Sequence, residues 1–427
     1  MTRILALTNF YPPWSVGGDR SAADVLERLA RRGHEVTVLT SDWSDPTTRD
    51  DYRPAADVIR ALRLYWDDHR VVVPPRRRRA FMEWCNRRAL DAALARSRPQ
   101  VVCVWTMGAL SMGVLHRLRD TGLPLVYAVC NDWLVWGPDQ DAWVTGWADR
   151  PRSGRVAAVL TGLPTTLPDI GASGTFLFVS DWTRRYAEER SRWSYPDSAV
   201  VYSGYEAEEF GPAASTPAST PTTNTAGTEG RRGWGGRLLF VGRLDPDKGP
   251  VTALEALARL PGGSTLTVVG PGHAEDRLAL VARAAELGVA SAVRFDQRPR
   301  SELAPLYREA DVLVFPSRWE EPFGLTPLEA MACGTPVVAT CLGGSAEYLH
   351  DRRNCLCVPP EDPVALAQAV TELSADPALR GRLLGAGRTT AAQLTTEALA
   401  DSFEAWLEAA AGGFASGRPS QRHLELP

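Results

Sequence analysis

Lysine is almost absent from this chain of 427 residues, because only one of its 47 lysine and arginine residues is a lysine. That residue, Lys248, stands in the run Gly242-Arg243-Leu244-Asp245-Pro246-Asp247-Lys248-Gly249. A lysine ammonium is a compact charge on a flexible stem, whereas the arginine guanidinium is a rigid planar fork, so a crowded phosphate site can accept lysine and reject arginine. Lys248 is therefore the first candidate for chemistry, and chance survival on a solvated turn is the alternative.

Strong net charge, Cys-x-x-Cys pairs and long apolar runs are also lacking. The formal net charge of -4 argues against a general nucleic-acid binder, which would be strongly basic. Several of the seven cysteines lie in apolar runs typical of strands, so we expect reduced core cysteines in a cytoplasmic protein. At the N-terminus only residues 4–7 are apolar, which is far too short for a signal sequence or a spanning helix.

Short apolar runs alternate with helical patterns along the whole chain. Such alternation predicts parallel sheets with crossover helices, and the predicted fold class is α/β, with two doubly wound Rossmann-like domains facing a cleft. Strands are predicted at residues 4–8, 36–40, 101–104, 125–129 and 176–179 of the first half, and at 238–241, 266–269, 293–295, 312–315 and 337–340 of the second.

The length of the chain suggests two domains. We place the first at residues 1–205 and the second at 206–395, and we expect a helix at about 396–412 to pack back on the first domain. Residues 211–236 contain no Leu, Ile or Val, so they are predicted to be a flexible insertion. Ligands of such sheets bind outside the carboxyl ends of the strands, and Lys248 follows one of these ends.

The densest group of candidate residues lies at 317–336, between a predicted strand and a predicted helix. Thr326 as N-cap and Pro327 at the first helical position would leave the amides of residues 324–328 at a positive helix end, where a phosphate binds readily. Gly324 has no side chain to keep a ligand away from the backbone. For Glu329, a capping box with Thr326 is an equally good explanation that needs no ligand.

This stretch resembles the Glu-x7-Glu signature of family-4 retaining glycosyltransferases of the GT-B fold, with Glu321 and Glu329 as its two acids. The similarity is close over residues 238–375 and looser in the first half. It continues in Gly242-Arg243-Leu244 with Lys248-Gly249, in Val269-Gly270-Pro271-Gly272, in Ala310-Asp311-Val312 with Phe315-Pro316-Ser317, in Gly343-Gly344 with Glu347, and in Gly17-Gly18, residues 32–36 and residues 204–210.

The resemblance implies a retaining hexosyltransferase that moves a sugar from a nucleotide-sugar donor to an acceptor hydroxyl. Its first domain would bind the acceptor, which is a sugar, a glycoconjugate or a natural product, and its second domain the donor. Two side-chain cations would supply the charge that Mg²⁺ supplies elsewhere, so neither a metal nor a cofactor is expected. A front-side attack, with the leaving phosphate taking the acceptor's proton, would need no protein nucleophile.

Individual roles follow from the same resemblance. Arg243 and Lys248 would hold the donor diphosphate. Glu329 would bind the ribose hydroxyls, and Glu321 would contact the donor sugar. Further donor contacts are expected at Gly17, Gly18, Gly270, Gly272, Phe323, Gly324, Leu325 and Thr326.

Candidates for the acceptor side lie in a tryptophan-rich first half. The family often has a histidine after its fourth strand, where this chain has Asn131, an amide that bonds sugar hydroxyls but does no acid–base chemistry. Asn131 and Asp132 are candidate sugar contacts, and capping of the following turn is the alternative. Trp133 and Trp136 suit stacking on a sugar or an apolar acceptor, although packing of a loop onto the sheet explains them equally well.

A basic run, Arg76, Arg77, Arg78 and Arg79, precedes Phe81 and Trp84. Such a run is typical of a solvated helix start. A second hypothesis is weak contact with an anionic membrane surface, at its inner face, or with a phosphorylated acceptor.

Other functions are compatible with two Rossmann-like domains. A nucleotide-sugar epimerase of the same architecture would turn over donor without acceptor, and a catalytically silent protein would only bind a partner. Intact Arg243, Lys248, Glu321 and Glu329 argue against the silent protein. A nicotinamide dehydrogenase is excluded because neither first strand is followed by Gly-x-Gly-x-x-Gly. The nucleotide, the sugar and the acceptor stay open.

Overall fold

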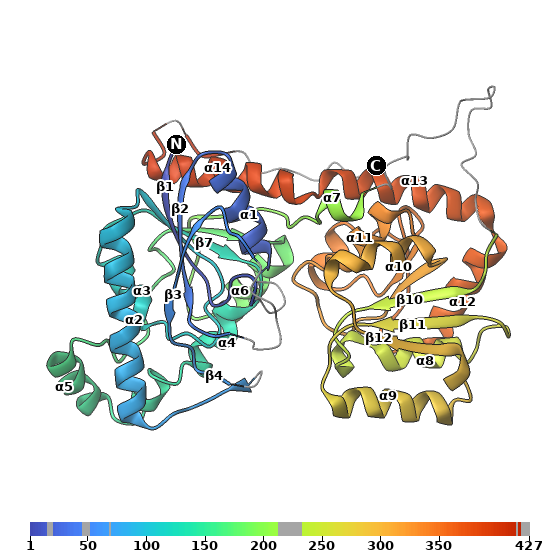
Figure 1. The fold of residues 1–427 in the computed structure, drawn as a ribbon, viewed down its shortest axis with the longest axis horizontal. Helices are drawn as coiled ribbons and strands as arrows, with labels where there is room; N and C mark the ends of the chain where they lie inside the picture. The colour runs from blue at the N-terminus through green and yellow to red at the C-terminus, as the bar shows by residue number, and fades with distance from the viewer. Residues whose placement is uncertain (15–19, 45–51, 68–69, 212–232, 416, 420–427) are drawn as a thin grey trace. The chain divides into compact units, whose positions relative to one another are not determined.

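A computed structural model describes residues 1–14, 20–44, 52–67, 70–211, 233–415 and 417–419 (Figure 1). The chain divides into two compact units. The first contains Met1–Ser203 and the C-terminal segment from Thr396, and the second contains Gly204–Thr395. Each unit has its own parallel sheet.

The first unit is built on a seven-stranded sheet in the order β3-β2-β1-β6-β7-β8-β9. All five strands predicted for this half are present, and β3 and β9 are additional. The strands are β1 Arg3–Leu7, β2 Glu35–Ser41, β3 Asp57–Leu62, β6 Val101–Val104, β7 Leu125–Val129, β8 Thr175–Phe178 and β9 Ser198–Val200, and β4 Trp66–Asp67 pairs with β5 Arg70–Val71 in a separate hairpin. Strand β3 lies at the sheet edge and is mostly half-exposed, so its apolar signal is weak.

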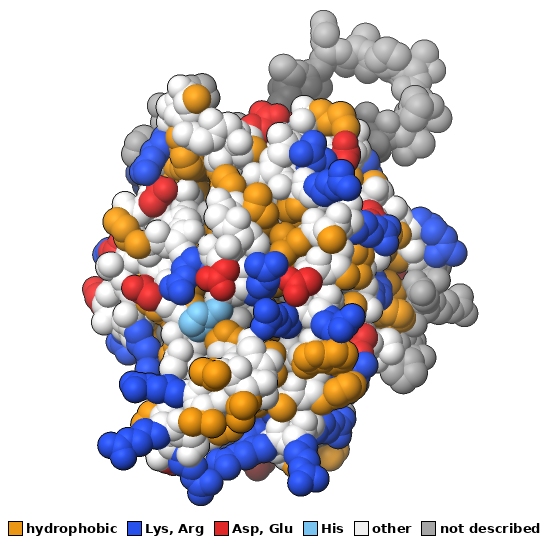
Figure 2. Space-filling model, turned by 90° about the vertical axis from the view of Figure 1, so that its left-hand side faces the viewer, with side chains coloured by type: hydrophobic (Ala, Val, Ile, Leu, Met, Phe, Trp, Pro, Cys, Tyr) orange, Lys and Arg blue, Asp and Glu red, His pale blue; other side chains and the backbone are white. Residues whose placement is uncertain are grey.

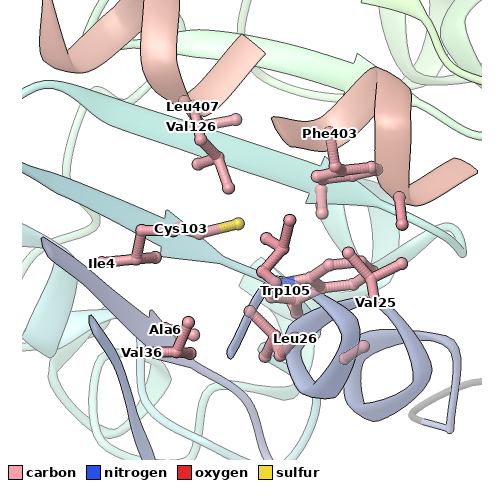
Figure 3. Packing of buried hydrophobic residues seen from close by; sticks show 14 of the residues in the cluster. Ile4, Ala6, Val25, Leu26, Val36, Cys103, Trp105, Val126, Phe403 and Leu407 are labelled. Atoms are coloured by element: carbon pink, nitrogen blue, oxygen red, sulfur yellow. The ribbon is translucent and has the colours of Figure 1, made fainter. Parts of the chain in front are cut away.

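Helices cover both faces of this sheet because alternate residues of a strand point to opposite sides. Ile4 and Ala6 of β1 pack with α1 and α14, whereas Leu5 and Leu7 pack with α2 and α3. On the α14 side Trp105 stacks on Phe403, with ring centroids 4.9 Å apart (Figure 3). The helices of this unit are α1 Arg20–Arg31, α2 Arg76–Ser97, α3 Gly113–Arg119, α4 Trp133–Gln140, α5 Pro151–Thr161, α6 Asp181–Arg190 and α14 Thr396–Ala411.

Charged contacts also join α14, at the end of the chain, to the start of the first unit. Arg32 pairs with Glu397, Asp401 and Glu404, and His34 Nε2 lies 2.8 Å from a Glu404 carboxylate oxygen. The hydrogen bond from Arg32 holds the pKa of Glu397 below its ordinary value. The apolar face of α14 therefore completes the core of the first unit, and its acidic face is held by ion pairs with Arg32.

The second unit has a six-stranded sheet in the order β12-β11-β10-β13-β14-β15. All five strands predicted for this half are present, and the added β15 lies at the edge next to β14. The strands are β10 Arg237–Val241, β11 Thr265–Val269, β12 Val293–Asp296, β13 Val312–Phe315, β14 Val337–Ala339 and β15 Leu356–Cys357. The helices are α7 Ala207–Phe210, α8 Pro250–Leu257, α9 Ala274–Glu286, α10 Leu303–Glu309, α11 Thr326–Cys333, α12 Pro363–Ala375 and α13 Pro377–Gln393.

The predicted insertion at 211–236 is only partly described, since residues 212–232 lie outside the described ranges. At its end, Trp234 packs against the core of the second unit, and the Arg380 guanidinium lies 5.3 Å from the centroid of its ring. The prediction of a flexible segment is therefore wrong for this residue. A tryptophan carries enough apolar surface to pack against a core even in a segment without Leu, Ile or Val.

The expectation of reduced cysteines is wrong for two of the seven, because Cys341 and Cys357 form a disulfide. Residue Cys357 ends β15, which pairs with β14 through Ala339, two residues before Cys341. This pairing brings the two Cα atoms to 5.9 Å, within the range that a disulfide needs. No Cys-x-x-Cys spacing marks the pair, because the bridge depends on the register of two neighbouring strands.

Glu83 of α2 is a buried carboxyl in the first unit, and it accepts a hydrogen bond of 2.6 Å from the Tyr65 hydroxyl. Burial raises the pKa of Glu83 to about 8. A raised acid pKa means that folding favours the protonated form, so this contribution to stability is present below the unfolded pKa and is lost as the pH rises through about 8.

In the wild type the free energy of unfolding should decrease as the pH rises from about 5 to about 9. We expect Glu83→Gln to make this decrease smaller, because the amide stays neutral at every pH. Urea unfolding at several pH values measures this slope. The exposed glutamate variant Glu275→Gln serves as the control and should keep the wild-type slope. Equal slopes for wild type and Glu83→Gln would contradict the prediction.

Candidate functional site

Lys248 lies at the carboxyl edge of the second sheet, in the loop after β10. The 3-10 helix η3, Pro246–Lys248, ends at Gly249 in the left-handed conformation, with φ 72°. The Lys248 ammonium lies 2.6 Å from Glu321 Oε1, and the Ser317 hydroxyl donates to the same oxygen at 3.0 Å. The only lysine and the first acid of the Glu-x7-Glu signature are therefore direct partners.

Backbone contacts hold the two loops of this pair together. Strands β10 and β13 are parallel neighbours, so the loops that follow them leave the same edge of the sheet. The Asp247 carbonyl accepts hydrogen bonds from the amides of Arg318, at 2.8 Å, and Trp319, at 3.1 Å. A Cβ atom on Gly249 would lie 2.0 Å from the Pro316 carbonyl oxygen, so only glycine permits this approach.

The Lys248–Glu321 pair is largely shielded but still accessible. The side chains are 16% and 11% exposed, respectively. An ammonium has three N–H donors, so Lys248 can bind Glu321 and still offer hydrogen bonds to an anion. The Trp319 ring, with its centroid 6.0 Å from the ammonium, lies beside the pair. This arrangement presents a positioned positive charge beside a fixed carboxylate.

Glu329 is buried on α11. Its two carboxylate oxygens meet the Tyr307 hydroxyl at 2.9 Å and the Arg300 guanidinium at 3.4 Å. The prediction of Thr326 as the N-cap residue is wrong by one position, because Thr326 is already the first residue of α11. Leu325 occupies the N-cap position, and its side chain makes no capping hydrogen bond. The first intrahelical bond joins the Glu329 amide to the Leu325 carbonyl, so the preceding amides still mark a positive helix end.

The other predicted donor residues have different environments. Arg243 pairs with Asp245 at 3.2 Å, and its side chain is 62% exposed. Gly270 and Gly272 pack against the loop after β10, because a Cβ on Gly270 would lie 1.9 Å from the Gly242 carbonyl oxygen. These glycines therefore have a structural reason to be glycine. Gly17 and Gly18 lie outside the described residues.

Phe323 and Gly324 are held by a residue that sequence reasoning missed. The hydroxyl of the buried Tyr348 donates to the Gly324 carbonyl, and its ring centroid lies 5.1 Å from that of Phe323. Burial, and then the nearby Glu321 carboxylate, raise the pKa of Tyr348 well above its ordinary value, so this hydroxyl remains a donor. A buried tyrosine outside the matched motif gives no sequence signal of this role, and the same holds for Tyr307 and Arg300.

The predicted acceptor residues make contacts that support the structural alternative. Asn131 Oδ1 accepts from the Trp133 amide at 3.0 Å, and an Asp132 carboxylate oxygen accepts from Trp136 Nε1 at 2.8 Å. Trp133 is fully buried in the core of the first unit, so its prediction as an acceptor contact is wrong. Trp136 is partly buried and packs against Gly108. Both tryptophans lie on α4 rather than on a loop.

The basic run begins α2, as the helix-start interpretation predicts. Arg76, Arg77 and Arg78 are exposed, whereas Arg79 is buried and donates to the Ala142 carbonyl. Arg79 is therefore not part of a surface patch. Among the residues that the structure describes, no helix is both long enough and apolar enough to span a membrane.

Two Rossmann-like units, each built on a parallel sheet, define the GT-B fold, and the Lys248–Glu321 pair lies at the carboxyl edge of the second sheet. Residues 231–390 match the family model for glycosyl transferases group 1, and residues 16–209 match that for glycosyltransferase family 4. The chain belongs to the family-4 glycosyltransferases of the GT-B fold.

Curated relatives agree with this family. Glycogen synthase of Mycobacterium tuberculosis strain H37Rv is 28% identical over 407 residues, which cover 90% of this chain and 89% of the relative. D-inositol 3-phosphate glycosyltransferase of Frankia alni is 43% identical over 160 residues, which cover 35% of this chain and 39% of the relative. The stronger identity is therefore confined to a part of each protein.

Solved structures show the same fold. Sucrose-phosphate synthase of Thermosynechococcus elongatus has a TM-score of 0.71 and 24% identity, covering 98% of this chain and 100% of that structure. HepE of Anabaena, in complex with UDP and glucose, has a TM-score of 0.66 and 16% identity, covering 95% and 98%. The similarity extends over both units of the chain.

Proposed function

We propose that the chain is a retaining hexosyltransferase that transfers a sugar from a nucleoside-diphosphate sugar to an acceptor hydroxyl without a metal. The observation that carries the proposal is the contact of 2.6 Å between Lys248 and Glu321, in two loops that backbone bonds hold together. Arg243, on the same loop as Lys248, is exposed and can turn toward the diphosphate. Glu329 is the proposed ribose contact.

Charge development explains why this arrangement promotes transfer. As the bond from the sugar carbon to the diphosphate oxygen breaks, the leaving group gains negative charge. Lys248 and the amide end of α11 then stabilise the transition state more than the ground state. The acceptor oxygen bonds to the same face of the sugar carbon, and its proton passes to the leaving phosphate. Glu321 orients Lys248 and the donor sugar rather than attacking it.

A uridine nucleotide is the first donor to test. Crystal structures of the Anabaena protein HepE contain UDP and UDP-glucose, and their fold extends over most of this chain. A ligand that binds only the folded state raises stability by RT ln(1 + [L]/Kd). We therefore expect UDP to raise the melting temperature more than GDP, ADP, CMP or dTDP, each at the same millimolar concentration. A shift with none of the five would contradict the proposal.

A reaction without acceptor distinguishes the proposed transferase from a nucleotide-sugar epimerase. NMR of the protein with nucleotide sugar alone should show no second nucleotide-sugar epimer, whereas a transferase needs acceptor for turnover. Appearance of an epimer would replace the proposed function with the alternative.

We also propose that the first unit contacts an anionic membrane surface at the inner face of the cytoplasmic membrane. The C-terminal end of α5 lies near α2, since Arg87 of α2 donates to the carbonyl of Gly162, the residue that follows α5. Arg76, at the start of α2, donates at 3.3 Å to the carbonyl of Gly146, which precedes α5. Both helices expose apolar side chains near arginines, and basic and apolar side chains alternate over the lower part of the face shown in Figure 2. The exposed apolar residues are Phe81, Trp84, Val156, Val159 and Leu160.

We expect the protein to co-sediment with phosphatidylglycerol vesicles at low salt and to be released at high salt, because each basic residue near acidic lipid contributes about 1 kcal/mol. Val159→Glu with Leu160→Glu should abolish this binding. The matched control is Leu278→Glu with Val281→Glu, which changes exposed apolar residues of α9 in the second unit. Binding that the first double variant retains would contradict the proposal.

A further inference from the structure

Three of the seven cysteines converge at the edge of the second sheet. Cys341 follows β14, Cys357 ends β15, and Cys355 precedes β15. The Cys355 sulfur lies 3.7 Å from the Cys357 sulfur and 3.9 Å from that of Cys341. All three sulfurs lie within 4.8 Å of one another, although Cys341 and Cys357 are joined as a disulfide.

The two longer separations suit ligands of one metal ion. Sulfurs about 2.3 Å from a tetrahedral zinc ion are about 3.8 Å apart, which is close to both distances from Cys355. Cys355 is fully buried, whereas Cys341 and Cys357 are partly exposed. The cluster therefore has a closed inner side and an open outer side, through which an ion can enter and retain a solvent ligand.

The surrounding backbone holds Cys355 and Cys357 independently of any bond between the sulfurs, and the pairing of β15 with Ala339 of β14 keeps them beside Cys341, two residues further on. The Asp351 carboxylate accepts from the Cys357 amide at 2.9 Å, and the Arg352 amide donates to the Cys355 carbonyl at 2.8 Å. The buried Asn354 ties the same turn to the Tyr348 carbonyl at 2.7 Å. Opening the disulfide would therefore leave the three sulfurs close together.

We propose that Cys341, Cys355 and Cys357 form a binding site for a thiophilic metal ion, Zn²⁺ or Cu⁺, when the disulfide is reduced. A dithiol reductant supplies the two electrons and two protons that convert the disulfide to two thiols, and the reductant itself becomes a disulfide. The metal ion then binds three thiolates and displaces three protons. Thiolate sulfur selects these soft ions over Mg²⁺ and Ca²⁺.

The site is separate from the sugar-transfer chemistry but adjoins its scaffold. Cys341 precedes η6, Gly343–Glu347, and the Gly344 amide donates to the Glu321 carbonyl at 2.7 Å. A bound ion would join the start of this segment to β15. The proposal does not depend on the donor or on activity, so metal binding can be tested by itself.

Cobalt titration of the reduced full-length chain under anaerobic conditions tests the site. Thiol counting first establishes that the disulfide is open. We expect one Co²⁺ per chain, with thiolate-to-cobalt charge-transfer absorption that Zn²⁺ abolishes by displacement. A parallel titration with Cu⁺ in the presence of a competing chelator distinguishes Zn²⁺ from Cu⁺ as the preferred ion. Binding of one Zn²⁺ or one Cu⁺ per chain supports the site.

Matched variants assign the ligands. The buried-side variant Cys355→Ser and the partly exposed variant Cys357→Ser should each lose the charge-transfer band. Cys85→Ser, on α2 of the first unit, should keep it. Circular dichroism confirms that each variant is folded. A fully reduced protein that binds neither cobalt, zinc nor Cu⁺, or two folded cluster variants that bind like wild type, would overturn the proposal.

Discussion

Lys248→Ala should lower kcat/KM for sugar transfer by about 10²-fold to 10³-fold, the loss typical of removing one group that stabilises a developing anion. In the structure this ammonium is positioned by Glu321 at 2.6 Å, and the chain has no second lysine that could take its place. The measurement is the rate of nucleoside-diphosphate release with donor and acceptor present. Wild-type activity would contradict the role of Lys248.

Two further substitutions make this result specific. Lys248→Arg should also be poor, because the planar fork does not reproduce a compact charge in the shielded space beside Glu321. Arg318→Ala removes a cation from the facing loop, where Arg318 pairs with Asp247 and Glu361, and it should retain activity. Equal melting temperatures of Lys248→Ala and Arg318→Ala would show that the loss is chemical rather than structural.

Gly249→Ala should strongly lower activity, although it leaves every charged group in place. Its Cβ would lie 2.0 Å from the Pro316 carbonyl oxygen, so the loop of Lys248 must move away from the loop of Glu321. A misplacement of about 1 Å can cost roughly 10²-fold in rate, and we expect at least that loss of kcat/KM.

Gly288→Ala is the matched control for this substitution. Both glycines have φ 72°, but a Cβ on Gly288 would meet nothing within 4 Å. Left-handed backbone strain alone costs about 1–2 kcal/mol, so Gly288→Ala should lower stability modestly and keep activity. Thermal unfolding and donor turnover of the two variants separate strain from steric displacement. Equal activities would show that the loop contact does not position Lys248.

Local patterns in the sequence were sufficient for the architecture and for the main candidates. Apolar runs separated by helical stretches predicted ten strands that the structure contains, and the Glu-x7-Glu stretch indicated the family that the two family models match. These features depend on neighbours in the chain, since strand length, helix period and motif spacing are all local. The exposed start of α2 at Arg76 is a further local prediction that the structure confirms.

Packing reversed other interpretations. Trp133 appeared suited to stacking on an acceptor, yet it is fully buried, and Asn131 caps the turn before it. Tryptophan offers the same apolar face to a ligand and to a core, so composition cannot choose between them. Trp234 is a second example, because this apolar residue packs against a core although the segment around it is polar.

The sequence by itself indicated the family and the two α/β units, and it singled out Lys248 as a candidate, because each of these depends on short runs of neighbouring residues. Only the tertiary structure decided that Lys248 meets Glu321, that Glu329 bonds Tyr307 and Arg300, and that three cysteines converge. Those contacts join residues distant in the chain, and they depend on strand order and register. A parallel sheet brings the ends of non-consecutive strands to one edge, and no local pattern specifies which side chains meet there.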